Sequence, residues 1–90
     1  MDDKVQEVMN ILQEECAEVI QAVSKCRRFG LDNKKTDLSK SNVECLEDEI
    51  GDLLAMVDIL IEKNIVSPYN LQLATQAKKE KLKVWSKIYE

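Results

Sequence analysis

The hydrophobic residues of the chain recur three or four positions apart, which is the spacing of an amphipathic α-helix. In the first third of the chain they are Val8, Met9, Leu12, Cys16, Val19, Ile20 and Val23. The same spacing returns in the second third, at Leu46, Ile50, Leu53, Val57 and Leu60. The chain has only two glycines and one proline, and no run alternates with the period of two that is typical of a strand. The pattern therefore predicts an all-α protein.

Glycine and a polar segment mark the end of the first predicted helix. The periodic stretch predicts a helix over 3–28, and Gly30 suits its end because glycine adopts left-handed conformations readily. Residues 29–41 are polar and lack a clear period, so they form a connection. Connections of this length inside compact helical domains are uncommon and are often functional.

Start signals mark the other two predicted helices. Ser41 followed by Glu44 fits a capping box, which predicts a helix over 43–63. Ser67-Pro68 combines an N-cap residue with proline at the first helical position, which predicts a third helix over 68–88. We expect an antiparallel bundle of three long helices, forming a single domain over 1–90. Trp85 is expected to anchor its core.

The size and composition favour a small globular protein that associates. A chain of 90 residues buries only about 60–65% of its unfolded surface, so we expect a homodimer or homotetramer to complete the bundle. No apolar run approaches the roughly 18 residues of a membrane span, and the first residues do not resemble a secretion signal, which favours the cytoplasm. The net charge of −4 argues against nucleic acid as a partner.

The absence of histidine and the pattern of cysteines limit the possible chemistry. Without histidine the chain has no Ser/His or Cys/His nucleophile pair and no histidine-bearing zinc or di-iron motif. Its three cysteines include no CxxC pair, so we expect reduced thiols that act as small core residues. Any catalysis must therefore use carboxylates, lysines, arginines and a hard metal ion.

Four acidic residues lie on the apolar sides of the first two predicted helices. With about 100° of rotation per residue, Glu15 lies about 20° from Val8, and Glu18 about 60° further round. Glu49 lies within the apolar stripe of the second helix, and Asp52 again lies about 60° from it. Each helix thus contributes an acidic pair, one turn apart, on its inward side.

A cation would explain this placement of the acids. Several carboxylates close together on an apolar face repel one another unless a cation lies between them. Ligation by oxygen alone favours Mg²⁺, Mn²⁺ or Ca²⁺ over Zn²⁺ or Cu²⁺. The alternative is that these acids belong to solvated faces, as acidic helix residues usually do. Two inward pairs on consecutive helices favour the metal.

The segment Glu14-Glu15-x-x-Glu18, followed by Glu49-x-x-Asp52, resembles the signature of the MazG-like, all-α nucleoside triphosphate pyrophosphohydrolases. The neighbouring residues 46–54 strengthen the likeness, and residues 24–30 are similar to those of small, phage-encoded members. The resemblance implies that Glu15, Glu18, Glu49 and Asp52 ligate Mg²⁺, with Mn²⁺ as a possible substitute. It also implies cleavage between the α and β phosphates. Glu14 is a candidate general base, although one of the ligating glutamates could serve instead.

Lysine and arginine side chains are expected to bind the phosphates, because a triphosphate carries more charge than one Mg²⁺ neutralises. Lys78 and Lys81 lie on the apolar side of the third predicted helix, where they could equally extend to solvent at the bundle edge. Lys25 and Arg28, near the end of the first helix, form a second candidate pair.

Contacts to the nucleobase are assigned to the polar connection. Phe29 and Asn42 flank it and are the candidates. Two alternative functions stay open: a phosphoribosyl-ATP pyrophosphohydrolase, and a helical interaction module without catalytic activity.

Overall fold

The computed structural model describes residues 1–90 and contains three α-helices and no strand. The helices are α1 (Asp3–Phe29), α2 (Asn42–Glu62) and α3 (Pro68–Trp85). The predicted all-α class is therefore confirmed. The chain divides into two compact units, Met1–Ile59 and Leu60–Glu90.

Local hydrogen bonds define both ends of α1. Before its first residue, the side chain of Asp2 accepts a hydrogen bond from the backbone N–H of Val5 at 2.8 Å. At its end, the backbone N–H of Gly30 donates to the carbonyl of Cys26 at 2.9 Å. The predicted stop at Gly30 is confirmed, with a φ of 93° that favours glycine. Its ψ of 155° is extended, so the conformation differs from the expected left-handed cap.

The predicted capping box forms at the start of α2. The hydroxyl of Ser41 accepts a hydrogen bond from the backbone N–H of Glu44 at 3.2 Å. The carboxylate of Glu44 in turn accepts one from the backbone N–H of Ser41 at 2.9 Å. Ser41 is buried, and the two bonds satisfy donors that a helix start would otherwise leave unpaired.

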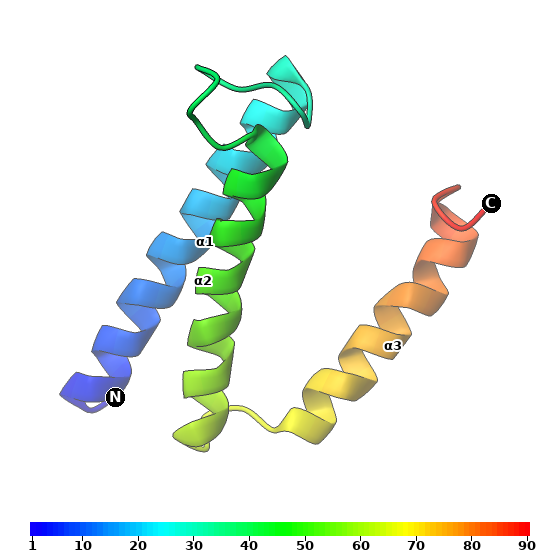
Figure 1. Cartoon of the computed structure of the whole chain (residues 1–90). Coiled ribbons are helices and arrows are strands. Elements are labelled where there is room, and N and C mark those ends of the chain that lie inside the picture. Colours follow the sequence, from blue (N-terminus) through cyan, green and yellow to red (C-terminus); the bar gives the residue numbers. More distant parts are fainter. The chain divides into compact units, whose positions relative to one another are not determined.

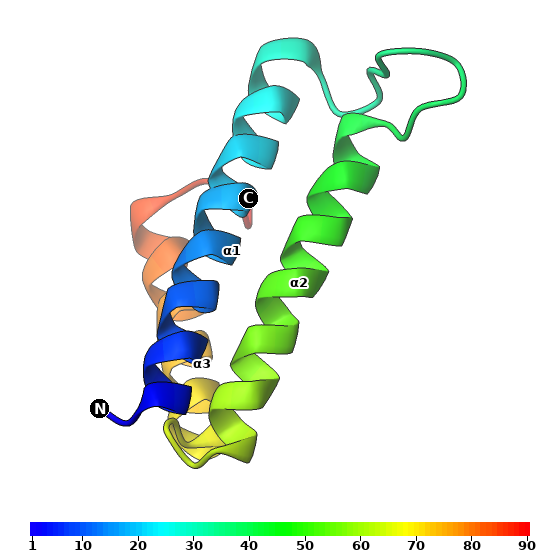
Figure 2. The same ribbon diagram turned by 90° about the vertical axis from the view of Figure 1, so that its left-hand side faces the viewer.

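Helix α1 and the part of α2 up to Ile59 lie side by side and run antiparallel (Figures 1 and 2). Their buried hydrophobic side chains include Val8 and Ala22 on α1 and Met56 on α2. A helix pair buries only one stripe of each member, and much of the remaining apolar surface is exposed. Ile20 and Leu54, for example, are 69% and 56% exposed.

Two expectations about burial are wrong, one for the cysteines and one for Trp85. Cys16 and Cys45 are exposed, and Cys26 is only half-buried, although all three thiols are free. The reason is geometric, because residues that flank the buried stripe of a two-helix pair still face outward. Trp85 is 82% exposed at the last position of α3 and does not anchor a core.

Helix α3 begins at the predicted signal. The hydroxyl of Ser67 accepts a hydrogen bond from the backbone N–H of Asn70 at 3.2 Å, and Pro68 occupies the first turn. The helix ends three residues earlier than the predicted 88, because Ser86 adopts an extended conformation with φ −142° and ψ 161°. No helix of the protein combines the length and the apolar character that crossing a membrane requires.

Candidate metal centre

Three carboxylates from two helices come together in the first unit. Glu15 lies on α1, and Glu49 and Asp52 lie on α2. One oxygen of each carboxylate lies within 4.8 Å of the others. Glu15 and Glu49 are half-buried and Asp52 is exposed. We call these three residues the acidic cluster.

The helix repeat explains why the acidic cluster lies where it does. Val8 precedes Glu15 by seven residues, and Met56 follows Glu49 by seven, which in each case is about two helical turns. Since the helices are antiparallel, the buried Val8 and Met56 occupy one level of the interface and the glutamates the next. Asp52 is three residues from Glu49 and so lies on the same side of α2. An apolar layer therefore adjoins the acidic cluster and partly shields it from water.

The acidic cluster carries negative charge that no basic side chain neutralises through an ion pair. The pKa of Glu49 is raised above its ordinary value of 4.5 by partial burial and then by the negative charges of Glu18, Asp52 and Glu15. No lysine or arginine forms an ion pair with the acidic cluster, because the two ion pairs of the structure, Lys40–Asp48 and Lys83–Glu80, lie elsewhere. A set of oxygen donors with excess negative charge fits a hard divalent cation such as Mg²⁺.

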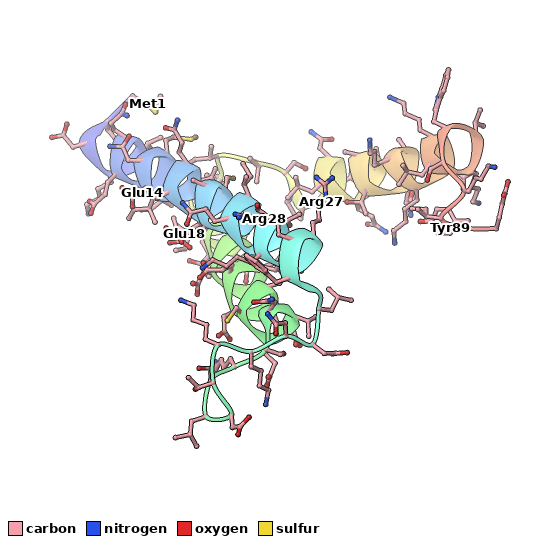
Figure 3. The ribbon with its side chains drawn as sticks, turned by 90° about the horizontal axis from the view of Figure 1, so that it is seen from above. Met1, Glu14, Glu18, Arg27, Arg28 and Tyr89 are labelled. Atoms are coloured by element: carbon pink, nitrogen blue, oxygen red, sulfur yellow. The ribbon has the colours of Figure 1, made fainter.

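The other two predicted acids lie close to the cluster but outside it. Glu18 is exposed, and its oxygens are not among the three that converge, yet it is the foremost charge acting on Glu49. Glu14 is exposed too, and Figure 3 shows Glu14 and Glu18 along α1. On an ideal helix Glu14 is rotated about 100° from Glu15. Its role as general base stays a prediction.

Three of the predicted substrate-binding residues line a hollow of about 280 Å³. They are Lys25, Phe29 and Asn42. Asn33 and Lys35 complete the lining. The sequence does not predict these two, because the connection has no period from which to infer the direction of a side chain.

The remaining basic candidates lie elsewhere. The guanidinium of Arg28 lies over the ring of Phe29, 5.0 Å from its centroid, near the end of α1 (Figure 3). Lys78 and Lys81 are exposed on α3, in the unit Leu60–Glu90. Their contact with phosphate stays a prediction.

Comparison with known families decides the class of protein. The chain matches the family described as "MazG nucleotide pyrophosphohydrolase domain" over residues 3–84. This chain belongs to the MazG family. The match confirms the resemblance drawn from the acidic motifs, and it makes the protein a member of a family of nucleotide pyrophosphohydrolases. No curated protein and no solved structure gives a significant match.

Proposed function

We propose that this MazG-family protein hydrolyses nucleoside triphosphates, with ribose or deoxyribose, to the monophosphate and pyrophosphate in an Mg²⁺-dependent reaction. The observation that carries the proposal is the acidic cluster Glu15, Glu49 and Asp52, which gathers three carboxylates without a basic partner. In a family of nucleotide pyrophosphohydrolases, such a cluster suits the binding of a metal that neutralises phosphate charge.

The residues of the acidic cluster would hold Mg²⁺, and Glu18 would complete the set. Mg²⁺ or Mn²⁺ held there would neutralise charge on the phosphate oxygens and make the attacking water easier to deprotonate. The raised pKa of Glu49 supports this role, because partial burial and then the neighbouring negative charges disfavour its bare carboxylate, and a cation would offset both effects.

The reaction then needs a base and a binding site for the leaving group. Glu14, or an oxygen of a ligating glutamate, accepts a proton from the attacking water. The water oxygen bonds to the α-phosphorus as the bond from that phosphorus to the α–β bridging oxygen breaks, and the bridging oxygen leaves with pyrophosphate. Lys78 and Lys81, with Lys25 and Arg28 as the second pair, are proposed to bind the phosphates. The chain has no histidine for a covalent phosphoryl intermediate, which favours direct attack by water.

We also propose that residues 1–90 act as one domain in a homodimer or homotetramer. The exposed hydrophobic side chains support association, since Ile20 and Leu54 on the first unit and Val84 on α3 are each more than half exposed. A second subunit could cover such side chains and increase the buried area of a small chain.

Hydrolysis in ¹⁸O-labelled water, followed by phosphorus NMR and mass spectrometry, tests the reaction. With a deoxynucleoside triphosphate and Mg²⁺ we expect monophosphate and pyrophosphate, with the label only in the monophosphate, because water attacks the α-phosphorus. Orthophosphate as the product, or label in the pyrophosphate, would refute the proposed reaction. The same assay with phosphoribosyl-ATP tests the alternative substrate.

A further inference from the structure

A hollow at the loop end of the first unit is lined by Lys25, Phe29, Asn33, Lys35 and Asn42. We call it the loop hollow. Its walls come from the last turns of α1, the connection and the first residue of α2. Its lining combines two cations, two amides and one aromatic ring, which is a mixed set of groups suited to a ligand that is flat and polar at its edge.

The helix repeat places the loop hollow in line with the proposed metal centre. Lys25 follows Glu18 by seven residues, and Asn42 precedes Glu49 by seven. Seven residues advance a helix by about 10.5 Å and rotate it by only about 20°. Lys25 therefore lies on the face of α1 that carries Glu18, and Asn42 on the face of α2 that carries Glu49, each two turns closer to the connection. A nucleotide whose α-phosphate lies at the carboxylates would extend its sugar and base along these two helical turns toward the loop hollow.

Backbone hydrogen bonds fix the wall around Asn42. Its side-chain amide donates to the carbonyl of Gly30 at 2.9 Å. Its backbone N–H donates to the carbonyl of Asn33 at 3.0 Å, and the N–H of Val43 donates to the carbonyl of Leu31 at 2.9 Å. These hydrogen bonds hold the polar segment that follows α1 against the first turn of α2. They leave the Oδ1 atom of Asn42 without a protein donor, so it is available as an acceptor.

Phe29 provides an aromatic surface in the loop hollow. The residue is 55% exposed, so part of its side chain is accessible to a ligand. Arg28 covers one face of the ring, and this leaves the opposite face for stacking. Aromatic side chains stack on nucleobases in many proteins that bind nucleotides in single strands.

We infer that the loop hollow binds the nucleobase of the substrate, with the base stacked on Phe29. Lys35 donates to oxygen or ring-nitrogen acceptors at the base edge, and the Oδ1 atom of Asn42 accepts from a ring N–H or amino group. Guanine offers O6 and N7 as adjacent acceptors, whereas adenine has an amino group in place of O6. The loop hollow therefore favours guanine over adenine. This inference rests on the proposed function in one respect, the placement of the α-phosphate at the carboxylates.

Nucleosides without phosphate test the inference independently of the metal. In ¹H–¹⁵N spectra we expect deoxyguanosine to shift the side-chain amide signals of Asn33 and Asn42, with deoxyadenosine binding more weakly. Phe29→Leu keeps an apolar side chain but removes the ring, and should weaken deoxyguanosine binding by on the order of tenfold. Phe29→Tyr is the matched control and should bind like the wild type.

Two results would overturn the inference. One is that Phe29→Leu binds deoxyguanosine as tightly as the wild type. The other is that pyrophosphate shifts the Asn33 and Asn42 amides while deoxyguanosine does not, which would make the loop hollow a phosphate site. Failure of the proposed reaction is detected separately, in the ¹⁸O experiment, because nucleoside binding involves neither metal nor turnover.

Discussion

Replacement of Ser41 by alanine tests how the start of α2 is held in place. The change removes the hydroxyl that accepts the Glu44 backbone N–H at 3.2 Å, at a residue that is only 6% exposed. Loss of such an N-cap side chain costs about 1 kcal/mol of unfolding free energy, with an upper range of about 2 kcal/mol. For a domain of this size, about 1 kcal/mol lowers Tm by roughly 4–8 °C.

Thermal unfolding followed by circular dichroism measures this effect. Ser24→Ala is the matched control, because Ser24 is exposed in the interior of α1, where alanine is a better helix former than serine. We expect a lowered Tm for Ser41→Ala and an unchanged or slightly raised one for Ser24→Ala. If both variants unfold at the wild-type temperature, the capping box does not stabilise α2.

The pH dependence of the capping box gives a second measurement on the same element. Hydrogen bonds from the backbone N–H and then the hydroxyl of Ser41 lower the pKa of Glu44 below its ordinary 4.5. Because this pKa is lowered in the folded state, ionised Glu44 stabilises the fold above pH 4.5. This stabilisation is lost as the pH falls through the lowered value. The Tm difference between wild type and Glu44→Gln should therefore shrink at acidic pH, and a constant difference would contradict this explanation.

Three further predictions concern metal, phosphate and assembly. Because the pKa of Glu49 is raised, its contribution to stability without metal falls as the pH rises from 4.5 through the raised value. Mg²⁺ should therefore raise Tm more at pH 7 than at pH 4.5, and equal increases in Tm at the two pH values would contradict the proposed metal site. Lys81→Ala should lower kcat about tenfold with little change in Mg²⁺ affinity, whereas Lys83→Ala, whose lysine pairs with Glu80 at 2.8 Å, should leave kcat unchanged. Light scattering at micromolar concentration should detect a dimer or tetramer, and a stable monomer would refute association.

Helix starts were predictable because their signals are local. Ser41 and Glu44 are three residues apart, so both capping bonds form within one turn. The same holds for Ser67, whose hydroxyl accepts from Asn70. The end of α3 was predicted less well, because no glycine or proline follows Trp85 to mark it.

The acidic cluster was predictable in part. Periodicity fixes the rotation of a residue about its helix axis, and this put Glu15, Glu49 and Asp52 on facing sides. It does not fix how close two carboxylates approach, and so it did not separate the converging three from Glu18. The burial of Cys16 was wrong for a related reason, since an apolar stripe drawn on a wheel is wider than the strip that a single neighbouring helix covers.

The loop hollow was the least predictable feature. Asn33 and Lys35 lie in a segment without regular structure, and their positions depend on long-range hydrogen bonds such as that from Asn42 to Gly30, twelve residues apart. Such bonds leave no periodic signal in the sequence.

Comparison of Glu49→Gln with Glu47→Gln in an assay for Mg²⁺-dependent pyrophosphate release tests the central claim most directly. Glu47 is an exposed acid on the same helix, outside the acidic cluster, so its variant makes the same chemical change away from the site. Changes in the outer shell of metal sites typically reduce activity 10- to 100-fold, and the loss of a direct ligand should cost about a hundredfold or more. We expect Glu49→Gln to lose at least that much kcat/KM while keeping the helical circular dichroism spectrum, and Glu47→Gln to remain near wild type. Near-normal pyrophosphate release by Glu49→Gln would contradict the assignment of the acidic cluster as the metal centre.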